Sequence, residues 1–521
     1  MSDAFVLDPL DVRRAREAPG VLRTFNDASV LAAADVHVAR RITALAGEQD
    51  ELVLLAAAFA VRGPRLGHVC VDLATIHETA TVDTEEAVDL TTLPWPDPAD
   101  CVARVAASPL VAVEGAPAAA AGAEAAARAD ADAAGGADAA GPSSAGGPRP
   151  LLLAGTALYL DRYWREESAV AADVQTLAAA PTDAVRPDVL HDGLVRLFPD
   201  AGAGDRQRLA AAAAVLSRFA VVAGGPGTGK TTTVARIVAL LLEQAAAAGE
   251  PLPVVALATP TNTAAARLTA AVRAETEKLD ADEAVKDQLR GLEAMTLHRL
   301  LGWRPGSHSR FRHDRDNRLP HDVVIIDETS MVSLTHMARL VEAVRPGARL
   351  VLVGDPGQLT SIEAGAVLGD IVGPTSGGLR MSDTTRGRLG AALDEPVDAA
   401  PGPPVGDGIV VLERVHRFDE AIGSVADAIR RGDADGTIAA LEAAAAGGGP
   451  GAPQGKVTWL RTDVAETGAD LAPIRDGVTA AARARSSRRP GRATRRRRSR
   501  RSATTGSSAR TAAGHTASRR G

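Results

Sequence analysis

A glycine-rich stretch at residues 224–231 has the residue types that bind phosphate. Its sequence, GGPGTGKT, matches the phosphate-binding loop G-x-x-x-x-G-K-[ST] at every fixed position. Glycines let backbone N–H groups turn inward toward phosphate oxygens, Lys230 can reach the β and γ phosphates, and the Thr231 hydroxyl can bind Mg²⁺. The predicted nucleotide-binding residues in this stretch are Gly224, Gly225, Pro226, Gly227, Thr228, Gly229, Lys230, Thr231 and Thr232.

Further polar positions suit nucleotide hydrolysis. Asp327 and Glu328 follow the apolar run VVII, where Asp327 would hold Mg²⁺ through water and Glu328 would be the general base for the attacking water. Gln358, in GDPGQL, could contact both a γ-phosphate and that water, and Gln207 could read an adenine edge. Taken alone, these residues also fit an ordinary strand end, turn or helix start. The phosphate loop is what favours the catalytic interpretation.

These residues need a framework that brings them together, and the surrounding sequence predicts one. From about residue 205 onward, short apolar runs alternate with helical stretches. The runs cover residues 219–223, 254–258, 323–327, 350–354 and 409–412. Continuous apolar strands separated by helices indicate a parallel sheet that is covered on both faces. A helix predicted over residues 232–244 would direct the positive end of its dipole at the phosphates.

The first part of the chain predicts a separate small domain. Residues 1–115 include two helix-like stretches, 31–44 and 51–61. Residues 116–150 are almost entirely Ala, Gly, Pro and Asp, so we expect a flexible insertion there. Residues 151–163 have strand–turn–strand character, and a helix is expected over residues 161–174.

Composition and charge exclude several classes of protein. The 521 residues are 45% apolar, which argues against wholesale disorder, and two cysteines are too few for a disulfide framework or a four-cysteine metal site. No apolar run approaches the ~20 residues of a membrane span, so we expect a cytoplasmic protein without membrane association. The last 39 residues hold 14 Arg and no acidic residue. Because the whole chain has a net charge of −7, the first 482 residues carry a net charge of −21. Such an acidic body is unsuited to coating nucleic acid with its whole surface.

The motifs, in their order, resemble the RecD family, the α subunits of exodeoxyribonuclease V. The matching stretches are GGPGTGKTTT, ATPTNTAAARL (258–268), TLHRLLGW (296–303), VVIIDETSM (323–331), GDPGQLTSIEAGAVLGDI (354–371) and VLERVHRFDEAIGSVADAIRRGD (411–433). The resemblance extends over most of residues 20–475. It implies a superfamily 1 helicase that uses ATP and Mg²⁺, moves 5′ to 3′ on DNA, and works in the RecBCD complex in double-strand break repair and recombination.

The resemblance also implies roles that the residues alone do not establish. Gln207 becomes the adenine-reading glutamine, and Arg417 becomes the motif IV arginine that touches the γ-phosphate. The family usually has Gly-Lys where this chain has Asn262-Thr263, so one phosphate-contacting charge is missing. The implied partners are single-stranded and duplex-end DNA, a RecB-like subunit, and a RecC-like subunit that binds the N-terminal domain. The implied DNA-binding residues are Pro260, Thr261, Asn262, Thr296 and His298.

The chain departs from the family pattern after Asp433. The family has a Ser-Gln-Gly motif there and a Thr-Arg-Ala-Arg motif that supplies an arginine finger, and neither occurs in this sequence. Loss of such a group can cost ~10³–10⁵ in rate, so we expect impaired hydrolysis. The basic tail has three interpretations: a DNA-binding arm, a solvated extension without a role, or out-of-frame translation of a GC-rich gene. The abrupt change of composition near residue 482 favours the third.

The sequence as a whole predicts an α/β protein with a RecA-like P-loop domain, a partial second RecA-like domain and a small, mainly helical N-terminal domain. The predicted function is an ATP-dependent DNA helicase subunit. The alternatives are a non-catalytic ATP-binding subunit of the same complex and a stand-alone RecD-like helicase. The predicted segments are 1–115 (partner-binding domain), 116–150 (flexible insertion), 151–204 (connecting segment), 205–375 (first RecA-like domain), 376–408 (flexible insertion), 409–482 (partial second RecA-like domain) and 483–521 (basic disordered tail).

Overall fold

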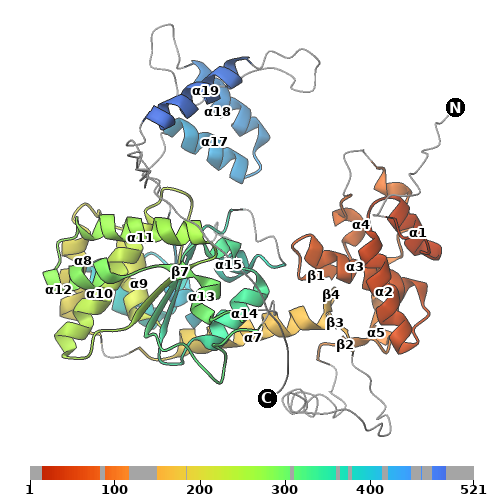
Figure 1. The fold of residues 1–521 in the computed structure, drawn as a ribbon, viewed down its shortest axis with the longest axis horizontal. Helices are drawn as coiled ribbons and strands as arrows, with labels where there is room; N and C mark the ends of the chain where they lie inside the picture. Colours follow the sequence, from red (N-terminus) through yellow and green to blue (C-terminus); the bar gives the residue numbers. More distant parts are fainter. Residues whose placement is uncertain are drawn as a thin grey trace, which may run out of the picture. The chain divides into compact units, whose positions relative to one another are not determined.

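The chain divides into two compact units, Met1–Asp433 and Ala434–Gly521. The first unit contains the N-terminal domain, a long helix that follows it and a central parallel sheet (Figure 1). The computed structural model describes residues 14–82, 88–115, 149–182, 185–304, 310–358, 364–373, 378–412, 420–446, 459 and 472–487.

The N-terminal domain packs helices around the strongly apolar α3 (Glu51–Arg65), whose middle turns are buried. The predicted helices over residues 31–44 and 51–61 are confirmed as α2 (Ala33–Ala46) and α3. Phe25, Phe59 and Trp95 form an aromatic cluster in this core, with the Phe25 and Trp95 ring centroids 4.7 Å apart. The remaining helices are α1 (Gly20–Asp27), α4 (Ile76–Thr79), the 3₁₀ turn η1 (Leu90–Thr92) and α5 (Pro98–Ala107).

Four short strands complete this domain in the order β1-β4-β3-β2. The predicted strand–turn–strand is confirmed as the antiparallel pair β3 and β4. Because β4 also pairs with β1 and β3 with β2, the domain extends to residue 160, and the boundary predicted at residue 115 is wrong. Of the predicted insertion, residues 116–148 lie outside the described residues. The strands are β1 (Cys70–Asp72), β2 (Val111–Val113), β3 (Leu151–Ala154) and β4 (Ala157–Leu160).

A long helix, α7 (Asp161–Ala179), leaves β4 and packs on α14 (Leu334–Ala343) beside the central sheet. It confirms the helix predicted over residues 161–174. The carboxylate of Glu166 is buried at this contact and accepts a hydrogen bond from Thr335 Oγ1 at 2.8 Å. The helix therefore links the N-terminal domain to the helices that cover the sheet.

The central sheet has six strands in the order β12-β5-β9-β8-β6-β7, and every neighbouring pair is parallel. All five apolar runs identified in the sequence form strands, and the sequence analysis missed only the two-residue β7. The α/β class is confirmed. The strands are β5 (Phe219–Gly224), β6 (Val255–Thr259), β7 (Met295–Thr296), β8 (Val323–Ile326), β9 (Arg349–Gly354) and β12 (Ile409–Leu412).

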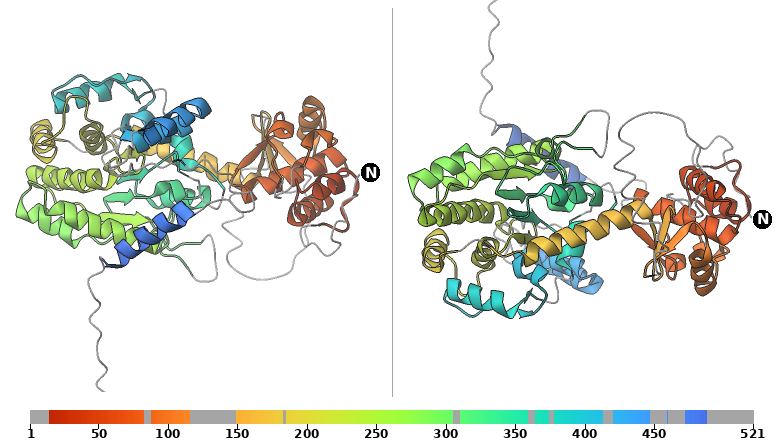
Figure 2. Two further views of the ribbon diagram at one scale, coloured as in Figure 1. Left: turned by 90° about the horizontal axis from the view of Figure 1, so that it is seen from above. Right: turned by 90° about the horizontal axis from the view of Figure 1, so that it is seen from below.

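Helices cover both faces of this sheet, so the inner strands β5, β8 and β9 are buried at every position (Figure 2). Alternate residues enter two different cores, as the pleat of a strand requires. Val222 and Val351 pack with α9 and α10, whereas Val221 and Leu350 pack with α7 and α14. The first core uses α8 (Pro187–Leu197), α9 (Arg206–Leu216), α10 (Lys230–Ala248), α11 (Asn262–Thr276) and α12 (Glu283–Gly291); the second also uses α13 (Leu297–Leu301) and α15 (Val367–Val372).

Residues 378–412 are folded, which corrects the prediction of a flexible insertion over residues 376–408. Leu379, Met381 and Leu389 are buried in the same core as α9. Asp407 stabilises the segment by accepting hydrogen bonds from the hydroxyls of Ser382 and Thr385, each at 2.8 Å. Among the described glycines and prolines that suggested flexibility, some lie inside short helices and strands and others lie in the links between them. These elements are β10 (Arg380–Met381), α16 (Asp383–Leu393), β11 (Ala400–Pro401) and the 3₁₀ helix η4 (Pro404–Gly408).

The strand β12 pairs with β5 and is an edge strand of the central sheet. The domain boundary predicted at residue 409 is therefore wrong, because backbone pairing places this strand in the same sheet as β5. Helix α17 (Glu420–Arg430) follows in the first unit, and the second unit contains α18 (Ala434–Ala446) and α19 (Ala472–Ser487). No helix in the described part of the chain is both long and apolar enough to cross a membrane.

Candidate nucleotide site

The predicted functional residues lie at one edge of the central sheet. The phosphate loop follows β5, Pro260 follows β6, Asp327 follows β8, and Thr296 is the last residue of β7. Because all these strands are parallel, their carboxyl ends meet at the same edge, which is where open α/β sheets bind ligands. Residues more than 100 positions apart in the sequence are thereby brought together.

The phosphate loop has the backbone shape that its glycines allow. Gly227 and Gly229 have φ angles of +83° and +86°, in the left-handed region that favours glycine. A Cβ atom at Gly229 would contact Nε2 of Gln207, so a larger residue there would displace this amide and would also be strained by the positive φ angle. Thr228 is buried, and its hydroxyl donates a hydrogen bond to the Gly225 carbonyl at 2.9 Å. The loop is thus a preformed cradle that leads into the N-terminus of α10.

Lys230 folds back over this loop. Its Nζ donates hydrogen bonds to the carbonyls of Gly224, at 2.6 Å, and Gly225, at 3.0 Å. Burial lowers the pKa of Lys230, while the nearby carboxylates of Asp355 and Asp327 act to raise it. Both of these acceptors are backbone carbonyls, so the ammonium group can be redirected to phosphate oxygens.

Asp327 and Glu328 emerge together from the buried strand β8. Burial raises the pKa of Asp327 to about 6, although its Oδ1 accepts a hydrogen bond from the Glu328 backbone N–H at 2.9 Å. Glu328 has a φ angle of +57°, which is unfavourable for a residue with a Cβ and costs about 1 kcal/mol. This left-handed conformation turns the chain sharply at the end of β8, where the carboxylates of Asp327 and Glu328 leave the sheet.

The donor set at this edge fits a nucleotide with a hard divalent cation. The cradle accepts phosphate, Lys230 carries the opposite charge, and the Thr231 hydroxyl and the Asp327 carboxylate are oxygen ligands of the kind that Mg²⁺ prefers. A half-buried carboxylate with a raised pKa would be stabilised in its charged form by a bound cation. We therefore regard this edge as a candidate site for nucleotide and Mg²⁺.

The remaining predicted nucleotide contacts differ in their positions. Gln358 lies after β9 and is exposed, and its backbone N–H donates to the Asp355 carbonyl at 3.1 Å. Gln207 lies in the first turn of α9 and donates from Nε2 to the Thr228 carbonyl at 2.9 Å. Arg417 lies outside the described residues. Gln207 thus contacts the phosphate loop directly, which its position in the sequence did not indicate.

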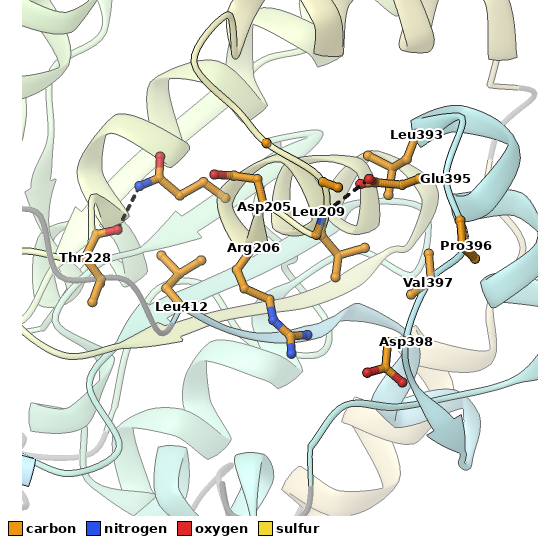
Figure 3. A pocket seen from close by; sticks show the side chains of 14 residues that line it. Asp205, Arg206, Leu209, Thr228, Leu393, Glu395, Pro396, Val397, Asp398 and Leu412 are labelled. Atoms are coloured by element: carbon orange, nitrogen blue, oxygen red, sulfur yellow. Dashed lines mark hydrogen bonds between the residues drawn. The ribbon is translucent and has the colours of Figure 1, made fainter.

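A pocket of about 420 Å³ adjoins Gln207 and Thr228 (Figure 3). Leu209, Pro396 and Leu412 contribute apolar surface to it, and Arg206 and Asp398 contribute charged groups from opposite segments. A pocket that combines apolar side chains with polar groups suits a flat aromatic ring with hydrogen-bonding edges. The segment 393–398, which forms one side of the pocket, was missed as a functional region because its composition resembles a linker.

The predicted DNA-binding residues lie at the ends of the neighbouring strands β6 and β7. Thr261 caps α11 by accepting a hydrogen bond from Ala264 N at 3.2 Å, and Thr296 caps α13 in the same way. Pro260 is half-buried, and Asn262 is exposed. The two caps give both threonines a local structural role and fix their backbones at the edge of the sheet.

His298 is exposed on α13 and belongs to a group of three rings. Its ring centroid lies 4.8 Å from that of His336 and 5.9 Å from that of Phe311. These two partners lie outside the TLHRLLGW motif, so the motif gave no signal for them. An exposed ring such as that of His298 can stack on bases of single-stranded DNA.

Comparisons with known proteins match two parts of the chain. Residues 27–159 match the family model for the N-terminal domain of the RecBCD enzyme subunit RecD, and residues 207–364 match an AAA domain. The RecBCD enzyme subunit RecD of Mycobacterium tuberculosis is 48% identical over 434 residues, which are 83% of this chain and 61% of that protein. The ATP-dependent RecD2 DNA helicase of Deinococcus radiodurans is 35% identical over 212 residues, 40% of this chain and 25% of that protein.

Among solved structures, a Pif1 helicase from Candida albicans matches with a TM-score of 0.27 at 17% identity, covering 48% of each chain. A score this low carries no argument. The fold and the cradle at the sheet edge define a P-loop nucleotide-binding protein of the α/β class. Residues 27–159 match the RecD N-terminal domain, and the chain is 47–48% identical to mycobacterial RecD subunits over the aligned residues, so the resemblance to RecD inferred from its motifs is confirmed. The chain spans about three-fifths of the length of the mycobacterial relatives it matches.

Proposed function

We propose that this chain is an ATP-hydrolysing motor subunit that moves 5′ to 3′ along single-stranded DNA within a RecBCD-type complex. The observation that carries the proposal is the convergence of Lys230, Asp327 and Glu328 at the carboxyl edge that also presents Thr261 and Thr296. A nucleotide site and a candidate DNA surface then share one edge of one sheet. Hydrolysis at the nucleotide site could then move the candidate DNA surface.

The proposed roles follow from the chemistry of each side chain. Lys230 would leave the loop carbonyls to neutralise the β and γ phosphates, and Asp327 and Thr231 would hold Mg²⁺, which supplies charge neutralisation when bound. Glu328 would accept a proton from the attacking water. Gln358 would contact that water and the γ-phosphate, and Arg417 would add positive charge there.

The base of the nucleotide would occupy the pocket beside Gln207. The apolar side chains of Leu209 and Leu412 would contact the ring faces, and the polar groups at the rim would read its edges. Gln207 would link the base to the phosphate loop through its hydrogen bond to Thr228. A purine nucleotide, ATP, is the proposed ligand.

Partners and compartment belong to the same proposal. The RecD-type N-terminal domain would dock on a RecC-like subunit, and the complex with a RecB-like subunit would act on duplex DNA ends. Its place would be the cytoplasm, where the free thiols of Cys70 and Cys101 would stay reduced. The alternative of a stand-alone helicase is tested by co-purification of the native chain with RecB-like and RecC-like subunits.

The decisive experiment is DNA-stimulated ATP hydrolysis by the purified chain, with Lys230→Ala as the comparison. We expect single-stranded DNA to stimulate hydrolysis, and we expect the variant to lose at least about 100-fold in rate, because a preorganised charge at the phosphates is removed. Arg273→Ala, which changes an exposed cation on the distant end of α11, is the matched control and should leave the rate unchanged. Equal rates for the wild type and Lys230→Ala would favour the non-catalytic ATP-binding subunit.

A further inference from the structure

Glu395 lies beside the candidate base pocket and holds the loop that leads into Gln207. Its Oε1 accepts a hydrogen bond from Arg208 Nη2 at 2.7 Å, and its Oε2 accepts one from the Gly204 backbone N–H at 3.1 Å. The side chains of Arg208 and Glu395 are only 14% and 18% exposed. A charge-assisted pair that is shielded from solvent is stronger than a surface ion pair. Figure 3 shows Glu395 at the side of the pocket formed by its own segment.

Both ends of this bridge are anchored in secondary structure. Glu395 follows Asp394, the residue that caps the end of α16, and its backbone N–H donates to the Gly390 carbonyl at 3.3 Å. Arg208 lies in the first turn of α9, where its backbone N–H donates to the capping carboxylate of Asp205 at 2.9 Å. The Glu395 side chain therefore joins the end of α16 to the beginning of α9.

The loop before α9 turns at residues 202–205, where the Asp205 backbone N–H donates a hydrogen bond to the Gly202 carbonyl at 3.3 Å. Gly204 has a φ angle of +73°, and its backbone N–H donates to Glu395, which adds a side-chain restraint to this turn. Asp205 follows at once as the helix cap, and Gln207 then reaches the Thr228 carbonyl. Residues 202–207 form one side of the pocket, while Leu393 and Pro396, adjacent to Glu395, lie on the other. One carboxylate thus holds the two sides of the pocket together.

We infer that Glu395 is a positioning residue for the nucleotide base: it sets the affinity for a purine by fixing residues 202–207 against residues 393–398. The inference rests on the proposed function, since it takes the phosphate loop to be a nucleotide site. Within the described residues, the side-chain hydrogen bonds of Glu395 go to Arg208 and Gly204 and not to the phosphate loop. Its removal should therefore weaken binding of the base and leave binding of the phosphates intact.

The test is isothermal titration calorimetry of the full chain with ATP and, separately, with inorganic tripolyphosphate, both with Mg²⁺. We expect Glu395→Ala to raise the Kd for ATP about five- to tenfold, the effect of losing a charge-assisted hydrogen bond, with less than a twofold change for tripolyphosphate. Glu395→Gln keeps an acceptor oxygen and should recover part of the ATP affinity. Glu293→Ala removes a glutamate that is 80% exposed and paired with Arg273, and it serves as the matched control.

Unchanged binding of tripolyphosphate also demonstrates that the variant is folded. If Glu395→Ala weakens ATP and tripolyphosphate equally, or weakens neither, the positioning role is overturned while the nucleotide site stands. If the wild type binds neither ligand, or if Lys230→Ala binds both as the wild type does, the proposed function itself fails. Arg208→Gln provides a second variant, and its effect combined with that of Glu395→Ala should be less than additive.

Discussion

At the scale of single residues, the site stores unfavourable energy at the position where chemistry is proposed. Asp327 is held where burial raises its pKa to about 6, and Glu328 has a left-handed backbone. Neither feature helps the chain to fold. Both place carboxylates at the end of β8, next to Lys230, where a cation and phosphates would compensate them.

This cost of burial predicts a pH-dependent stability difference for Asp327→Asn. An unfolded Asp has a pKa of about 4, so between about pH 4 and pH 6 the folded state holds a proton that the unfolded chain releases. The stability of the wild type therefore falls as the pH rises through this window, whereas the neutral Asn is unaffected. We expect the variant to gain about 2 kcal/mol in free energy of unfolding at pH 8 relative to the wild type, and almost nothing near pH 4.

Urea unfolding at several pH values, with a chelator and without nucleotide, measures this difference. Asp316→Asn, on the exposed turn before Asn317, is a control that should follow the wild type. A stability gain of the Asp327→Asn variant that is the same at pH 4 and pH 8 would contradict the assignment.

At the scale of elements, α7 is the connection that makes the N-terminal domain and the central sheet one unit. It packs on α14 through a buried contact in which Glu166 accepts a hydrogen bond from Thr335. Arg162 and Arg339 each place a guanidinium nitrogen 3.7 Å from the other oxygen of Glu166. The contact satisfies a buried carboxylate from two helices at once.

Replacing Glu166 by Leu should reduce the free energy of unfolding by about 2 kcal/mol, because Thr335 and the two arginines lose their shared acceptor. Thermal unfolding of Glu166→Leu, Thr335→Val and the double variant measures the coupling. Glu166→Gln keeps an acceptor for Thr335 and should lose less than Glu166→Leu. Strictly additive losses in the double variant would mean that the contact contributes nothing of its own.

At the scale of the whole molecule, charge and nucleotide chemistry occupy different parts of the chain. All described residues of the candidate nucleotide site belong to Met1–Asp433. The excess of arginine lies after residue 482, and residues 488–521 are outside the described structure. The net charge of −7 is therefore the sum of an acidic body, which repels DNA, and a basic tail, which attracts it.

Deletion of residues 488–521 should separate these two properties. We expect the Kd for ATP to change less than twofold, because the site lies in the first unit. Loss of twelve arginines should weaken DNA binding at low salt and flatten the dependence of log Kd on log salt concentration, because fewer counterions are released. Fluorescence anisotropy with labelled single-stranded DNA measures this, and an unchanged salt dependence would mean that the tail does not contact DNA.

The sequence alone determined the nucleotide loop, five of the six central strands, the parallel α/β class and the relation to RecD. These depend on local patterns: glycine spacing, apolar runs and short motifs whose residue order alone indicates their chemistry. The tertiary structure decided the rest. Strand pairing assigned residues 151–160 to the N-terminal domain and β12 to the central sheet. Packing showed that residues 378–408 are folded.

The same distinction holds within the site. Residue type and local motif predicted Lys230, Asp327 and Gln207 as members of the site. The hydrogen bonds from Gln207 to Thr228 and from Gly204 to Glu395, in contrast, join segments that are distant in sequence. Such contacts leave no local signal, because a glutamate after a helix has the same composition whether it faces solvent or closes a pocket. Only the folded chain brings these distant residues within hydrogen-bonding distance.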